Sequence, residues 1–218
     1  PRFGVNWSCT MDVAIRIANL LLAYDIFQSA GVVFDAEFDT IFSRSVGEHG
    51  YHIAENLEWS KDFRGNHYLA NLVGLIFVAS YLPEDQRTNT WLQFSVQELL
   101  IEIQYQFNDE GSNFEGSTAY HGLSSQLVAF AMAMVAGLPP DRTEALVRNP
   151  AVDLGKTSRV ARSGLELHQL PGNGDFTTLI PNECWRKLYL MAEFTQAITS
   201  PAGRIVQVGD NDSGRLFK

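Results

Sequence analysis

The sequence has few cysteines and few basic residues for its length, and each shortage excludes a class of protein. Its 218 residues include two cysteines, Cys9 and Cys184, too few for a disulfide framework. The 16 Lys and Arg residues are outnumbered by 25 Asp and Glu residues, which leaves a net charge of −9. A surface built to hold nucleic acid or an anionic membrane needs clustered basic residues. We therefore expect no nucleic-acid partner, while a local basic cleft is still compatible with this charge.

Long hydrophobic runs are also missing. The longest apolar run, residues 72–79, is interrupted by Gly74 and is far shorter than the ~20 residues that span a bilayer. We therefore expect no membrane insertion. The hydrophobic content of 45% is enough for one large core. The first residue is Pro1 and the last ten residues are turn-rich and charged, so we expect a part of a longer protein.

Apolar residues recur at helical spacing in six segments, each of which predicts an α-helix. These segments are residues 11–27, about 36–59, about 66–81, about 85–107, 117 or 118 to 138, and 184–199. The third is apolar nearly all round, which predicts an inner helix. Prolines are expected to end two of the helices, Pro83 after the third and Pro139 with Pro140 after the fifth.

Between and after these helices the pattern weakens. Residues 149–182 indicate a long irregular connection with turn residues at 171–175, and residues 204–208 form a short β-like run before Gly209. Consecutive helices with little β patterning and no heptad seam predict an all-α array of helix hairpins. No repeat motif indicates a regular solenoid. Periodicity is compatible with either a closed toroid or an irregular bundle.

Signals for a metal are weak. His49 and His52 stand three apart on a predicted helix, but no acidic or histidine partner follows at the spacing of a zinc protease. Asp210 and Asp212 lack the third oxygen ligand and the distant Glu of a calcium loop, so a hinge turn is the better interpretation. We expect no metal site and no cofactor.

Three motifs and the tail carry a family resemblance. They are residues 5–7 (Val-Asn-Trp), 65–68 (Gly-Asn-His-Tyr), the glycine-spaced run 109–121, and the tail 209–214. Together they resemble the heparinase II/III family, especially its bacterial members, over most of the chain. In that family an (α/α) toroid precedes antiparallel β-sheet domains, and the substrate lies in the cleft between them. The resemblance implies an incomplete (α/α) toroid at residues 1–200, with residues 201–218 a linker or the start of a missing β-sheet domain.

The resemblance also implies a polysaccharide lyase that cleaves uronic-acid glycans, glycosaminoglycan-like or alginate-like, by β-elimination. Its partner would be an anionic polysaccharide. Such toroids supply an Asn, often followed by His, at the start of an inner helix and a Tyr on a later one; Asn66, His67 and Tyr120 occupy those places. Asn66 and His67 would donate hydrogens to the uronate carboxylate, whose charge must be offset when the C5 proton leaves. Tyr120 would protonate the leaving oxygen or take the C5 proton. Family members commonly use a His from the missing portion as base, so we expect the fragment to be inactive alone.

Further candidates surround these three residues. The loop that leads into the fifth helix and that helix's start contribute three candidates for substrate contact: Asn113, Glu115 and His121. For Glu115 the favoured interpretation is that it braces the loop backbone. Four arginines would either line a cleft for a polyanion or merely solvate loops: Arg159, Arg162, Arg204 and Arg215.

Structural interpretations and other functions compete with the lyase. Asn66 could be a helix N-cap, His67 a half-buried histidine and Tyr120 a packing residue. One alternative function is a glycoside hydrolase with its acid and base among Asp109, Glu110 and Glu115. The other is a non-catalytic carbohydrate-binding domain. We expect a periplasmic or secreted protein, with the cytoplasm as the alternative location.

Overall fold

A computed structural model describes residues 4–60, 62–148, 179–211 and 214–217. Within these ranges the chain is helical and forms no strand, so the predicted all-α array is confirmed. The elements are η1 (Val5–Trp7), α1 (Thr10–Ser29), α2 (Ala36–Glu55), α3 (Asn66–Tyr81), α4 (Gln86–Gln106), α5 (Thr118–Ala136), α6 (Pro140–Arg148) and α9 (Asn182–Ala197).

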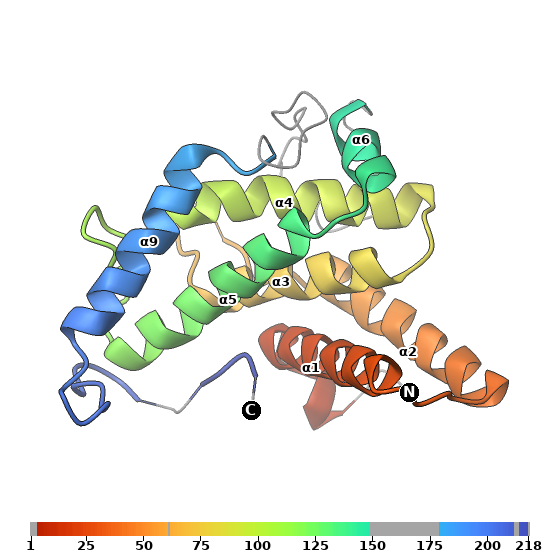
Figure 1. Cartoon of the computed structure of the whole chain (residues 1–218), viewed down its shortest axis with the longest axis horizontal. Helices are drawn as coiled ribbons and strands as arrows, with labels where there is room; N and C mark the ends of the chain where they lie inside the picture. Colours follow the sequence, from red (N-terminus) through yellow and green to blue (C-terminus); the bar gives the residue numbers. More distant parts are fainter. Residues whose placement is uncertain (1–3, 61, 149–178, 212–213, 218) are drawn as a thin grey trace.

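Helix α3 lies at the centre of the array and is buried along most of its length, as its uniformly apolar sequence predicts. It packs against α1, α2, α4 and α5, which surround it in Figure 1. Gly74 lets α1 come close, because a Cβ atom at this position would lie 2.7 Å from the Cβ of Ala14. The core therefore forms around the helix that carries Asn66 and His67 at its first turn.

Side-chain caps set the starts of three helices. Asp35 accepts a hydrogen bond from the backbone N–H of Phe38 at the start of α2. Asp85 and Thr88 form a reciprocal capping box at the start of α4. Ser117 accepts from the second and third residues of α5, one of which is Tyr120. The six predicted helices are confirmed, with ends that differ by up to four residues.

The largest difference lies at the end of α2, which was expected to reach residue 59 and ends at Glu55. The next residue, Asn56, has left the helical conformation at φ −131°, and Leu57 turns into the core. Glu58 therefore lies in the linker between α2 and α3 rather than on a helix.

Pro139 and Pro140 end α5 as predicted, and a short helix that the sequence analysis did not predict, α6, follows at once. Helix α6 starts at Pro140 itself, because proline fits the first position of a helix, where its missing N–H is not needed. Arg142 of α6 is buried and donates to the backbone carbonyl of Ala79 at 2.7 Å, near the end of α3. The connection expected at 149–182, with Arg159 and Arg162, lies largely outside the described residues.

The β-like run at residues 204–208 takes part in one isolated bridge, between Thr199 and Ile205. Its backbone bonds at both ends: the backbone N–H of Thr118 at the start of α5 donates to the carbonyl of Val208 at 3.0 Å, and the backbone N–H of Val206 donates to the carbonyl of Ile198, after α9, at 2.9 Å. In Figure 1 this C-terminal segment runs below α5 toward α1. Leu216 is buried there.

Helix α5 is long and apolar enough to cross a membrane, by length and composition alone. Core helices have the same composition, and 44% of its most apolar window is buried against the rest of the chain. The expectation of no membrane insertion stays a prediction.

Candidate functional site

The first turn of α3 is held by a carboxylate from another part of the chain. The backbone N–H of Asn66 donates to Glu115 Oε1 at 2.8 Å, and its side-chain Nδ2 lies 3.1 Å from Oε1 and 2.9 Å from Oε2. Gly65, the N-cap, offers no side chain for this purpose. An anionic group is favourable here because the first backbone N–H groups of a helix lack partners within it. Asn66 is thus the first residue of the helix and not its cap.

The loop at residues 107–117 presents Glu115. Asn113 braces it from within, donating to the carbonyl of Gln106 at 3.2 Å and accepting from the backbone N–H of Glu115 at 3.0 Å. Gly111 has φ +92° and packs directly on the backbone of α9 at Leu190. Bracing, which was expected of Glu115, is therefore done by the buried Asn113, while Glu115 reaches across to α3.

A buried polar network fixes the residues around Gly65. Glu102 on α4 pairs with Arg64 at 3.2 Å and accepts from Gln106 at 2.8 Å. Gln106 also donates to the carbonyl of Gly65 at 3.1 Å. Burial raises the pKa of Glu102, against the hydrogen bond from Gln106 and the charge of Arg64. The end of α4 thereby holds the start of α3 in place.

His67 pairs with Glu58, a residue that the sequence reasoning did not single out. Its Nδ1 lies 3.0 Å from Glu58 Oε1. The hydrogen bond with Glu58 raises the pKa of His67 despite partial burial. For Glu58, burial raises the pKa, but the hydrogen bonds from His67 and Asn71 outweigh it and the net shift is downward. The pair therefore favours an imidazolium beside a carboxylate.

Tyr120 lies in the first turn of α5, where its backbone N–H donates to the Ser117 hydroxyl at 3.2 Å, and its side chain is half-buried. His121 is buried beside it and faces α9: its Nε2 lies 2.9 Å from the hydroxyl of Thr195, and its ring packs edge-on against Phe194. Burial lowers the pKa of His121. Its predicted contact with substrate stays a prediction.

Glu115 joins the two helix starts. It lies two residues before Ser117, the N-cap of α5, and it bonds to the first residue of α3. The first turns of α3 and α5, with Asn66, His67 and Tyr120, therefore lie at the same end of the helical array. Gln106 brings the last turn of α4 to this end as well.

The remaining carboxylates of the loop turn to separate partners. Asp109 is fully exposed and lies 3.9 Å from the Lys187 ammonium, while Glu110 accepts from the Ser112 hydroxyl. Glu115 is bonded to Asn66. The hydrogen bonds of Asp109, Glu110 and Glu115, the carboxylates considered for a hydrolase, therefore do not direct these side chains to a common site.

The structure also shows the surroundings of several other predicted residues. His49 is buried and accepts from Arg16 at 3.1 Å, and Trp7 of the Val-Asn-Trp motif packs against the rings of His49 and His52. Arg204 and Arg215 line a cavity of about 520 Å³ between α5 and the C-terminal segment. The backbone carbonyl of Asp210 accepts from the Ser117 hydroxyl.

Comparison with known proteins gives one family and one solved structure. A family profile described as "Heparinase II/III N-terminus" matches residues 3–141. No curated protein matches the chain. A solved structure described as a heparinase III gene product with methylated lysines is similar over 91% of this chain and 25% of that chain, at 19% identity and a TM-score of 0.48. The chain thus spans about a quarter of that relative's length. The all-helical array agrees with a toroid-type N-terminal domain.

Proposed function

The chain belongs to the heparinase II/III N-terminal family, and from this premise we propose that it is the toroid part of a lyase that cleaves uronic-acid polysaccharides by β-elimination. The longer protein carries out the reaction, since the partner base and the other wall of the cleft are supplied from outside this chain. The substrate is an anionic glycan, glycosaminoglycan-like or alginate-like. A periplasmic or secreted location follows from such a substrate and stays a prediction.

The reaction needs donors for a carboxylate. Removal of the C5 proton moves negative charge onto the uronate carboxylate, and hydrogen-bond donors already in place lower the barrier by offsetting that charge. Asn66 and His67 supply these donors from the first turn of α3, where the helix dipole also favours an anion. Glu115 accepts the Asn66 amide hydrogens in the structure. A uronate carboxylate therefore competes with Glu115 for one of them.

Tyr120 supplies the proton for the leaving group. A phenol hydroxyl can donate to the glycosidic oxygen as the bond to C4 breaks. The observation that supports this role most directly is the hydrogen bonding of Glu115 to Asn66, because it brings the starts of α3 and α5 together. One sugar at this end of the array would have the Asn66 amide on one side and Tyr120 on the other.

The test is a product assay on a protein that contains this chain together with its following domains. A panel of uronate polymers is digested, and absorbance of the unsaturated uronate is recorded beside new reducing ends. Elimination gives both signals in equal amounts. Reducing ends without the unsaturated chromophore would indicate a hydrolase instead of a lyase. Binding of a polymer without either signal would indicate a carbohydrate-binding domain.

Tyr120→Phe then tests the assignment of the proton donor. Loss of an acid that acts in the transition state should lower kcat by about 100-fold or more, with binding of oligosaccharide nearly unchanged. Tyr24→Phe is the matched control, because the Tyr24 hydroxyl bonds to Asp39 in the α1–α2 hairpin. Equal rates for Tyr120→Phe and the unmutated protein would remove Tyr120 from the mechanism.

A further inference from the structure

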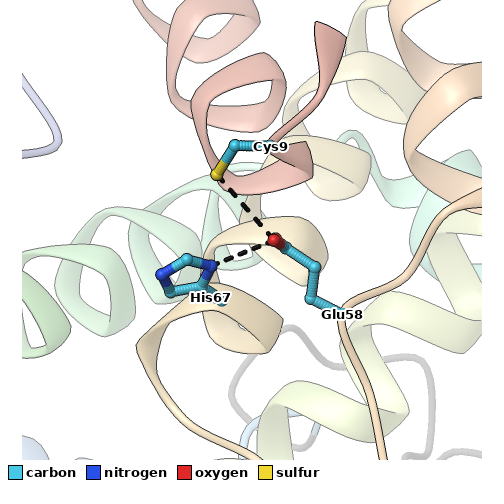
Figure 2. Close-up of side chains that lie close together, drawn as sticks. All are labelled: Cys9, Glu58 and His67. Carbon is cyan, nitrogen blue, oxygen red and sulfur yellow. Dashed lines mark hydrogen bonds and ion pairs between the residues drawn. The ribbon is translucent and has the colours of Figure 1, made fainter.

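Three side chains with metal-binding atoms converge beside the proposed cleft. Cys9 precedes α1, Glu58 lies in the α2–α3 linker and His67 is in the first turn of α3; Figure 2 shows all three pointing to one place. Glu58 Oε1 lies 3.8 Å from Cys9 Sγ and 3.0 Å from His67 Nδ1. The three ligand atoms lie within 4.8 Å of one another.

These separations fit one small ion. Zinc bonds of ~2.0 Å to nitrogen or oxygen and ~2.3 Å to sulfur place tetrahedral ligand atoms roughly 3.3–3.5 Å apart. The distances from Glu58 Oε1 to His67 Nδ1, 3.0 Å, and to Cys9 Sγ, 3.8 Å, lie on either side of this range. Cys9 Sγ and His67 Nδ1 lie within 4.8 Å of each other, and rotation of these side chains, which are half-buried or exposed, would bring the three atoms to bonding distance.

The carboxylate of Glu58 is held in position by a second layer of hydrogen bonds. Its Oε2 accepts from the backbone N–H of Met11 at 2.8 Å and from Asn71 Nδ2 at 3.2 Å. Asn71 is fully buried, and its Oδ1 accepts from the backbone N–H of Glu58 at 2.7 Å. Oε2 is thereby occupied, and Oε1 is directed at Cys9 and His67. Metal ligands are oriented by partners of this kind.

The surrounding charges favour a cation. Asp12 and Glu115 lie near enough to His67 to add to the effect of Glu58 in raising its pKa. Burial raises the pKa of the Cys9 thiol, while the backbone N–H groups of Asp12 and Met11 at the start of α1 oppose that shift. A divalent ion would offset the negative charge of a Cys9 thiolate and of the nearby carboxylates.

We propose that Cys9, Glu58 and His67 bind a zinc ion, with the fourth position open. The combination of thiolate, imidazole and carboxylate suits zinc and disfavours magnesium or calcium, which take oxygen ligands. The zinc ion replaces the thiol proton of Cys9 and the Nδ1 proton that His67 shares with Glu58, and both protons pass to solvent. A hollow of about 370 Å³, lined by Glu58, Thr10 and Trp59 among others, lies on the Glu58 side of the site. Sequence analysis led us to expect no metal, and the proposed site departs from that expectation.

The zinc site is compatible with the lyase but does not depend on it. His67 meets the ion through Nδ1, and its other ring nitrogen points away from Glu58 in Figure 2. An imidazole bound through Nδ1 carries its hydrogen on Nε2, so the donor to a uronate is retained. Zinc binding is measured without any polysaccharide. A chain that binds no zinc and a protein that shows no lyase activity are therefore separate results.

The first experiment is titration of the tag-free chain with zinc chloride by calorimetry, and with cobalt(II) by absorbance. We expect one site per chain and a cobalt–thiolate charge-transfer band. Cys9→Ser should abolish the band and weaken zinc binding by about 10-fold or more, and Asn71→Ala should weaken it within the ~10–100-fold range typical of outer partners. Cys184→Ser is the matched control, since Cys184 is buried against Gln104 on α4 and should leave both signals intact.

A second measurement needs no substitution, so a variant that fails to fold cannot obscure the result. Iodoacetamide labelling of the unmutated chain is followed by mass spectrometry, with and without zinc. Zinc should slow the labelling of Cys9, and a chelator should restore it, while the buried Cys184 should stay unlabelled in both conditions, which checks that the chain is folded. Labelling of Cys9 at the same rate in both conditions, or a cobalt band that survives Cys9→Ser, would overturn the site.

Discussion

Glu115 caps helix α3 from outside it, accepting the backbone N–H of Asn66 at 2.8 Å while its two oxygens also take the Asn66 side-chain amide. The two residues are 49 positions apart in the chain. This contact fixes the orientation of the Asn66 side chain and the distance between the starts of α3 and α5. Loss of the Glu115 carboxylate should therefore disturb the starts of both α3 and α5.

Removal of the Glu115 carboxylate is the first test. Glu115→Ala leaves the amide of the 7% exposed Asn66 without its partner, which should lower the free energy of unfolding by about 1–3 kcal/mol. Glu110→Ala is the control on the same loop, where an exposed carboxylate accepts from the neighbouring Ser112 hydroxyl and a change of about 0.5 kcal/mol or less is expected. Urea unfolding of both variants checks this. Equal losses of unfolding free energy in the two variants would mean that the Glu115 cap contributes no more than an exposed carboxylate.

The sequence predicts the local structure around Asn66 and around Glu115, but not the contact between them. The helix starting at Asn66 follows from an apolar run that begins there and stops before Pro83, so local pattern was enough. The loop before α5 follows from its glycines. That Glu115 meets Asn66 does not follow from either segment, because it depends on how α3 and α5 pack. Sequence reasoning accordingly assigned loop bracing to Glu115, and the structure gives that work to Asn113.

Gly111 is expected to control the position of Glu115. It has φ +92°, and a Cβ atom there would overlap the backbone of Leu190 on α9. Gly111→Ala should therefore push the loop off α9 and cost about 2–4 kcal/mol, the sum of left-handed strain and overpacking.

Gly116→Ala separates these two causes. Gly116 shares the left-handed backbone at φ +72° but has open space around its Cβ position, so only the strain of about 1–2 kcal/mol should appear. Thermal or urea unfolding of the pair checks the difference. Similar values for both variants would show that contact with α9 does not hold the loop.

A second glycine pair tests the close approach of α1 to α3. A Cβ atom at Gly74 would lie 2.9 Å from the Cα of Ala14, a backbone atom that cannot turn aside. Gly74→Ala should destabilise the chain by about 1–3 kcal/mol. Gly47→Ala on α2 meets nothing within 4 Å and should stabilise it by up to about 1 kcal/mol, because alanine favours the helix. A stabilising Gly74→Ala would contradict this packing.

The zinc-binding trio shows where sequence pattern stops being informative. His49 and His52 drew attention because they share one helix, yet both pack against Trp7. Cys9, Glu58 and His67 come from three segments, and Glu58 was expected inside a helix that in fact ends three residues earlier. Spacing rules find ligands within one element. Ligands assembled by packing become visible only once the elements are placed.

Glu102 provides a prediction about pH. It is fully buried on α4, near Arg64, Gln106 and Glu98, and burial raises its pKa more than Arg64 and Gln106 lower it. A carboxyl whose pKa is higher in the folded state than the ordinary value of ~4.3 binds its proton more tightly when folded. Its contribution to stability is therefore complete below the ordinary pKa and is lost as the pH rises through the folded-state pKa.

Glu102→Gln should remove this loss. The amide keeps the size of the side chain and carries no charge at any pH, so the variant should gain stability relative to the unmutated chain as the pH is raised from about 4 toward 7. Urea unfolding at several pH values measures the difference. Glu183→Gln, which removes an exposed carboxylate from the first turn of α9, is the control and should show no comparable rise. A Glu102→Gln chain that becomes less stable with rising pH, relative to the unmutated chain, would mean that the pairing with Arg64 outweighs burial and that the ionised Glu102 stabilises the start of α3.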